Sequence, residues 1–169
     1  MLISDSKMIK VLNYIADKID VLSNSWGGSP YNFWSLMVIK RITELALSGE
    51  RRQKGIVFLW VAGNEKSLIN HSSSVEISYT QGWEFDPNFH KLIWNRVHTS
   101  KHFRNNLVGI PGVMQVAVLS STAQRNHYSN YGTGISISVP SNNIHLYSSN
   151  EALRLPVKGL GITTTTGRS

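Results

Sequence analysis

The sequence predicts an α/β fold built on a mostly parallel sheet. Residues 21–25 and 55–62 have the length and composition of strands, and each follows a stretch of helical length. A helix between two such strands is the connection that parallel pairing needs, with a right-handed crossover. The segment 55–62 is apolar almost throughout, which is typical of a strand that is covered on both faces.

The first helix is predicted over residues 5–19. Apolar residues recur there every three or four positions and form one stripe that a core can bury. The members of this stripe are Met8, Leu12, Ile15 and Ile19. Ser4 or Asp5 can cap the start of the helix, and the strand at 21–25 follows its end.

A second helix is predicted over residues 32–48. It is apolar on most of its sides, which indicates a helix that packs against more than one neighbour. Gly49 follows the last turn and can serve as the C-cap. The polar segment 50–54 then leads into the strand at 55–62.

The remainder of the chain is less regular. Residues 65–110 show no clear period, and we expect an insertion there with a helix near 88–97. Strand composition returns after this segment, and one of the strands stops at Pro140. The further β-prone segments are 112–119, 134–139, 144–147 and the Thr-rich 161–167.

The composition limits the class of protein. The 169 residues are 41% hydrophobic and 16% charged, so the chain can bury the core of one domain and is too apolar for a disordered segment. No apolar run approaches the roughly 18 residues of a membrane span, and the first residues do not resemble a secretory signal. The compartment therefore stays unassigned. Because cysteine is absent, disulfides, thiolate zinc sites and cysteine nucleophiles are excluded.

The chain is basic, with a net charge of +7. Residues 87–150 contain no Asp or Glu, although Lys, Arg and His occur throughout this stretch. A solvated surface is the ordinary explanation of such a block, and a surface that binds nucleic acid or an acidic partner is the alternative. His98 and His102 have a spacing that suits a metal, but no third ligand accompanies them, so no metal site is predicted.

Glycine occurs in the turn that follows each of the first two predicted strands. The first strand runs into Ser25, Trp26 and Gly27, and the second runs into Gly63 and Asn64. Ligands of open parallel sheets bind beyond the carboxyl ends of the strands. The two strand ends are therefore expected to lie side by side at the functional edge of the sheet.

Four segments, taken in their order along the chain, resemble the subtilisin-like serine proteases. The family shows a strand that ends in a Ser-Leu-Gly-Gly-like turn, then Ala-Gly-Asn-Glu, then Phe-Ser-Asn-Tyr-Gly leading to Ala-Pro-Gly, and finally a Thr-rich segment before its nucleophile. The matching segments here are 21–28, 61–65, 128–132 with 137–140, and 162–166. The resemblance covers nearly the whole chain except 65–110.

The resemblance implies a three-layer α/β peptidase domain, of which this chain is a part, and the hydrolysis of peptide bonds through an acyl-enzyme. It implies that the Asn64 amide donates to the oxyanion that forms in the transition state, after a sharp turn that Gly63 permits. From its own surroundings in the sequence, Asn64 can also be a residue that caps its loop through a side-chain hydrogen bond.

The resemblance further implies a place for the polypeptide substrate. Ser25, Trp26 and Gly27 correspond to the strand that pairs with the substrate backbone, and Gly27 allows its close approach. Ala62 and Gly63 correspond to one side of the pocket for the residue before the scissile bond. Trp26 replaces a smaller aliphatic residue of the family, so it is either a wall of the specificity subsites or a core tryptophan.

The resemblance also implies what these residues lack. In the family, the triad Asp and His come before the first helix, and the triad Ser follows the Thr-rich segment in a Gly-Thr-Ser motif. Ser169 follows Gly167 and Arg168 instead and is not assigned as the nucleophile. We therefore expect a fragment that is inert alone and takes the remaining segments of the peptidase domain as its partner.

Two other classes of function remain open at this stage. One is a non-enzymatic module whose basic surface binds an acidic partner, although nucleic acid is not the partner that we expect. The other is a pseudoprotease that only holds peptides in the same groove. Members of the family often carry structural calcium, but the carboxylates of this chain define no site by their spacing, and no cofactor is assigned. These carboxylates are Glu65, Glu76, Glu84 and Asp86.

Overall fold

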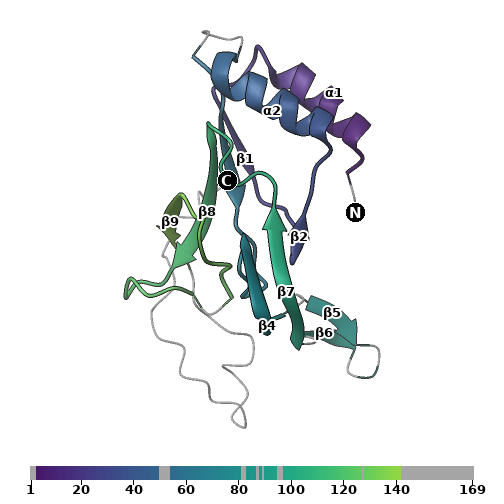
Figure 1. Cartoon of the computed structure of the whole chain (residues 1–169), viewed down its shortest axis with the longest axis vertical. Helices are drawn as coiled ribbons and strands as arrows, with labels where there is room; N and C mark the ends of the chain where they lie inside the picture. The colour runs from purple at the N-terminus through teal and green to yellow at the C-terminus, as the bar shows by residue number, and fades with distance from the viewer. Residues whose placement is uncertain are drawn as a thin grey trace, which may run out of the picture.

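The computed structural model describes residues 3–49, 54–80, 83–86, 88, 90–94, 97–126 and 128–141, with the backbone alone for 83–86 and 91–94. Its main sheet has four strands in the order β1-β3-β8-β9 (Figure 1). All of the pairings in this sheet are parallel, which confirms the predicted α/β class. The strands are β1 (Val21–Asn24), β3 (Val57–Val61), β8 (Val113–Leu119) and β9 (Ile137–Pro140).

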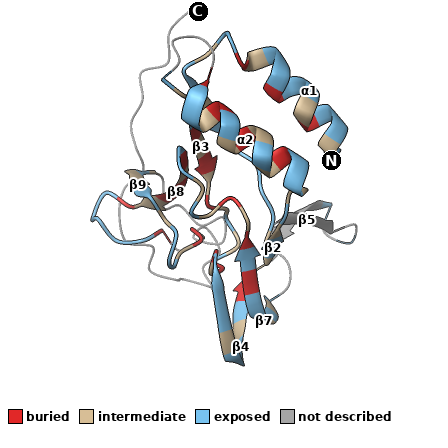
Figure 2. Cartoon of the chain, turned by 45° about the horizontal axis from the view of Figure 1, so that its top comes forward, coloured by how far each residue is buried: buried red, intermediate tan, exposed pale blue. Residues whose placement is uncertain are grey.

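Both described helices, α1 (Asp5–Ile15) and α2 (Leu36–Ser48), pack into one core with the buried face of β3. Alternate residues of β3 contribute to this core, since successive side chains of a strand point to opposite faces. The apolar stripes of the helices supply the rest, as the buried residues along them show (Figure 2). The main members of the core are Met8, Leu12, Val38, Ile42, Leu45, Phe58 and Trp60.

The opposite face of β3 is not covered by either described helix. Leu59 and Val61 are only partly buried, and Val57 is 39% exposed. The apolar run of β3 predicted cover on both faces, and the part of the chain that the structure describes supplies it on one. Phe58 and Trp60, on the face that the helices cover, are therefore more buried than Val57, Leu59 and Val61 on the other face, although all five residues are apolar.

The boundaries of both helices differ from the prediction. The first helix ends at Ile15 rather than 19, and a turn leads into β1. The second begins at Leu36 rather than 32, because the Ser35 hydroxyl accepts a hydrogen bond from the Val38 amide and caps the helix there. Residues Tyr31–Asn32 instead form the short strand β2. Gly49 is the C-cap, as predicted.

A long antiparallel ribbon occupies much of the segment that was expected to be an insertion. It consists of β4 (His71–Thr80) and β7 (Val97–Asn105), and β7 also pairs with β2. A hairpin of β5 (Trp83–Asp86) and β6 (Lys91–Trp94) follows along the chain between them (Figure 1). The helix predicted near 88–97 is wrong, because residues 91–94 pair antiparallel with β5 and Val97 pairs antiparallel with β4.

The strands predicted at 112–119 and 134–139 are confirmed as β8 and β9. The β-prone segments 144–147 and 161–167 lie outside the described residues. Among the residues that are described, no helix has both the length and the apolar character that crossing a membrane requires.

Candidate peptide-binding and oxyanion site

The carboxyl ends of β1 and β3 lie side by side. The two strands are parallel, and Asn24 pairs with Trp60, so the segments that follow them leave the same edge of the sheet. A Cβ at Gly27 would come within 4.0 Å of the Val61 carbonyl oxygen, and Gly28 and Ala62 line one small cavity of about 10 Å³. The structure therefore brings the two predicted halves of the site together.

Three tryptophans support the turn after β1. The Trp26 ring lies 4.9 Å from the Trp60 ring and 5.3 Å from the Trp34 ring, both in edge-to-face geometry. The Trp60 indole nitrogen donates a 2.8 Å hydrogen bond to the Trp26 carbonyl. Since Trp26 remains 37% exposed, one side of its ring packs on the core and another side faces solvent.

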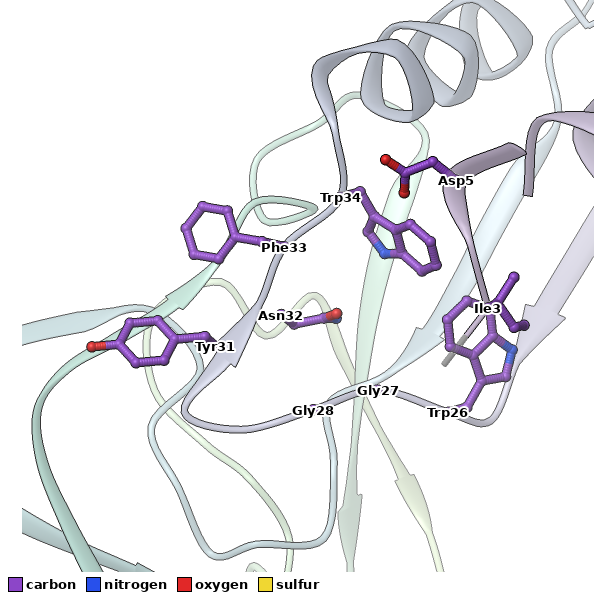
Figure 3. A pocket seen from close by; sticks show the side chains of 9 residues that line it. All are labelled: Ile3, Asp5, Trp26, Gly27, Gly28, Tyr31, Asn32, Phe33 and Trp34. Atoms are coloured by element: carbon purple, nitrogen blue, oxygen red, sulfur yellow. The ribbon is translucent and has the colours of Figure 1, made fainter. Parts of the chain in front are cut away.

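A hollow of about 460 Å³ opens beside this turn (Figure 3). Side chains alternate along the segment 31–34, so that Asn32 and Trp34 point to one side of it and Tyr31 and Phe33 to the other. Four of the nine lining residues are aromatic, and the others are one isoleucine, two glycines, one amide and one carboxylate. The lining residues are Ile3, Asp5, Trp26, Gly27, Gly28, Tyr31, Asn32, Phe33 and Trp34.

The loop after β3 is held by a segment that lies more than sixty residues later. Asn130 donates through its side-chain nitrogen to the Ala62 carbonyl at 2.8 Å and to the Glu65 carboxylate at 2.7 Å. Its side-chain oxygen accepts from the amides of Glu65 at 3.0 Å and Ser67 at 2.9 Å. Its own amide donates to the Gly63 carbonyl at 3.0 Å.

Two residues of the loop, Gly63 and Lys66, have a positive φ. Gly63 has a φ of 113°, and a Cβ there would overlap both the Asn130 amide and the Glu65 carboxylate. Lys66 has a φ of 53°, and its amide donates to the Tyr128 carbonyl at 2.8 Å. The glycine predicted from the sequence to permit a sharp turn is thus needed both for its φ and for the space it leaves.

Burial raises the pKa of the Glu65 carboxyl above its ordinary value. Hydrogen bonds from the Asn130 side chain and from the backbone amides of Glu65 and Asn64 oppose this rise without cancelling it. The carboxylate is therefore part of the support of the loop, and it does not extend freely into solvent.

The backbone amide of Asn64 belongs to this network through its bond to the Glu65 carboxylate, but its side chain does not. Its side chain is exposed, and within the described part of the chain it makes no hydrogen bond. The alternative in which Asn64 caps its own loop through its side chain is not what the structure shows, because Asn130 satisfies the loop instead. Ser25 is likewise exposed at the end of β1.

Several candidate residues do not come together. Asn64 is not among the residues that line the hollow. His102 hydrogen-bonds to Ser72, and the His98 ring lies 5.7 Å from Tyr79. In the described ranges, no three His, Asp or Glu residues converge as metal ligands would.

Sequence reasoning missed two residues of the site. Asn32 was placed in a helix, and its position beside the hollow follows only from the pairing of β2 with β7. Asn130 was noted as part of a motif, but its contacts with the loop after β3 join residues far apart in the chain. The Ser-Asn-Tyr-Gly motif itself was the available signal.

Comparison with known proteins identifies one family. The family model described as the subtilase family matches residues 2–167. A search of curated proteins gives no match.

Proposed function

Because the chain belongs to the subtilase family, we propose that it supplies the substrate-binding strand and the oxyanion-hole amide of a subtilisin-like serine endopeptidase. Its origin is that of a serine protease, whose substrate is a polypeptide. The observation that carries the proposal is the contrast at the end of β3. The Asn130 side chain accepts hydrogen bonds from the Glu65 and Ser67 amides of the loop, and the side-chain amide of Asn64 is left exposed.

The exposed segment after β1 suits an extended peptide. Ser25, Trp26 and Gly27 are all solvent-accessible, and a peptide that adds to them gains main-chain hydrogen bonds whatever its sequence. Gly27 has no positive φ, and a Cβ there would have only ordinary contacts within the fold. Its small size is therefore not required by the fold, which supports a role in admitting the peptide backbone.

The hollow beside Trp26 would receive a side chain of the bound peptide. Its aromatic walls favour an apolar or aromatic group, which gains by leaving water. Ala62 and Gly63 would line the pocket on the other side of the peptide strand, where they follow β3.

The Asn64 amide would stabilise the oxyanion. An amide is a neutral donor, and a donor that is held in place before the reaction costs no reorganisation when negative charge develops. The loop that carries Asn64 is held in this way, since the residues on both sides of it are bonded to Asn130.

We further propose that these 169 residues alone do not hydrolyse peptides, because they contain no serine in the motif of the family nucleophile. Binding and oxyanion groups without a triad leave only residual catalysis. A fluorophosphonate that labels active serines should leave the chain unmodified. Stoichiometric labelling of one serine in the isolated chain would contradict this part of the proposal.

Peptide binding is tested by titrating an extended peptide while following tryptophan fluorescence, since Trp26 lies beside the proposed strand. Gly27→Val should abolish the change while the fold is retained. Ser74→Val, on the exposed side of β4, adds a similar side chain away from the groove and should leave binding unchanged. Binding that both variants retain, and that weakens steeply with added salt, would favour the basic-surface alternative.

A further inference from the structure

The structure assigns Asn130 a role that its place in the sequence does not show. It lies in the turn that follows β8 and is 1% exposed, so its side chain is removed from water almost completely. A buried amide has to satisfy two donors and an acceptor within the protein, and each that it left unmet would cost stability.

Every polar atom of the Asn130 side chain is used on one loop. Its nitrogen donates to Ala62 and Glu65, and its oxygen accepts from Glu65 and Ser67. Together with the bond from its backbone amide to Gly63, the contacts span the loop from the end of β3 to Ser67. Within this span, Asn64 and Lys66 are the residues that Asn130 does not bond.

The pattern of bonds turns Asn64 outward. The residue before it and the residue after it are both tied to Asn130, and Gly63 has a conformation that other residues rarely adopt. The bond to the Glu65 carboxylate is charge-assisted when that group is ionised, and such bonds are shorter and stronger than neutral ones. The backbone of Asn64 is therefore fixed on both sides by one buried amide.

We propose that Asn130 is a positioning residue for the oxyanion hole, and that it sets the place of the Asn64 amide without touching substrate. The proposal rests on the proposed function only for the role of Asn64. The control of the loop by Asn130 can be measured without any reaction. The two are therefore separated by experiment.

The first arm follows hydrogen exchange of residues 62–68 by mass spectrometry in the whole chain. Asn130→Ala removes the acceptor of the Glu65 and Ser67 amides, and we expect the exchange of each amide to accelerate by about two- to tenfold, as the loss of one hydrogen bond implies. Val38→Ala is the control, because Val38 is fully buried in α2 and lies outside this loop. It should lower global stability without accelerating the loop selectively.

The second arm tests whether the contact is specific. Asn130→Asp keeps the acceptor but places a second acceptor against the Glu65 carboxylate, so the loop should again exchange faster. Adding Glu65→Gln restores a hydrogen bond at this contact, because the new side-chain amide at position 65 can donate to the carboxylate at position 130. We expect the double variant to recover much of the lost protection, which a loss caused by general destabilisation would not do.

The third arm uses the protease in which this chain is combined with the segments that supply the triad Asp, His and Ser. Asn130→Ala should lower kcat with little change in KM, as Asn64→Leu should. If loop exchange is unchanged in Asn130→Ala, the inference is overturned. If the loop is released as expected but Asn64→Leu leaves kcat intact, Asn130 still controls the loop, while the oxyanion role and the positioning role that depends on it are both rejected.

Discussion

The indole nitrogen of Trp60 donates a hydrogen bond of 2.8 Å to the backbone carbonyl of Trp26, and this bond ties the buried face of β3 to the exposed turn after β1. The rings of the two residues also meet edge to face at 4.9 Å. The core of the sheet thus determines where the proposed substrate strand begins. A substitution in the core should therefore alter peptide binding at the proposed groove.

Trp60→Phe should lower the free energy of unfolding by about 1–3 kcal/mol, because it leaves the Trp26 carbonyl without its buried donor. The same variant should weaken peptide binding, since the turn loses its anchor. Denaturant unfolding and the peptide titration measure the two effects. Unchanged peptide affinity in a destabilised Trp60→Phe would show that the turn does not depend on this bond.

Gly63→Ala should destabilise the protein by about 1–3 kcal/mol or more, because its φ of 113° is unfavourable for alanine and the new methyl group overlaps the Asn130 amide. Gly27→Ala is the matched control, since a Cβ at Gly27 would make only ordinary contacts and its φ is not positive. It should change stability by less than about 1 kcal/mol. Equal losses in the two variants, measured by thermal unfolding, would contradict this account.

The pH dependence of stability should carry the signature of Glu65. Its pKa is raised in the folded protein, so the native state holds the proton more tightly than the unfolded state, whose value is near 4.5. The contribution of this group to the free energy of unfolding is therefore largest below that value. It falls as the pH rises through the folded pKa.

Glu65→Gln has no proton to lose at this position, so its advantage over the wild type should grow as the pH rises from the ordinary carboxyl pKa of 4.5 through the higher folded pKa. Denaturant unfolding of both proteins across this range measures the difference. A difference that stays constant with pH, or that changes in the opposite direction, would contradict the assigned cause.

The isolated chain should self-associate. Within the described residues β1 is at one edge of the main sheet, and Val21 at its start is 54% exposed. An unpaired apolar edge recruits other strands unless something covers it. Light scattering at increasing concentration tests this, and addition of the remaining peptidase segments should reverse it. A monomeric chain with one cooperative melting transition would count against the expectation.

Much of the main sheet could be predicted because its signals are local. The strand at 55–62 and the period-two segment before Pro140 each show in a window of a few residues. The proximity of the segments after β1 and β3 could be predicted from the parallel connection of the two strands. The match of residues 2–167 to the subtilase family agrees with the resemblance drawn from the same segments.

The ribbon could not be predicted for a physical reason. Most side chains of β4 are exposed or only partly buried, so no face of that strand needs to be apolar and no period appears in its sequence. Its structure comes from antiparallel pairing with β7, which lies well beyond it along the chain. The contacts of Asn130 were hidden in the same way, since their partners precede it by more than sixty residues.

The pairing of His71 with Phe103 places the first and last parts of the ribbon next to each other. A segment whose ends already meet can lengthen between them without moving the sheet from which it departs, and the entropic cost of extra residues rises only slowly with their number. The far end of β4 is tied, since Thr80 donates from its amide and its hydroxyl to the Glu65 carbonyl beside Asn64. The register of the ribbon instead shifts between Ser72 and Ile77, so this mostly exposed stretch is the position for a genetically inserted tag or reporter domain, with the paired residues on both sides left in place.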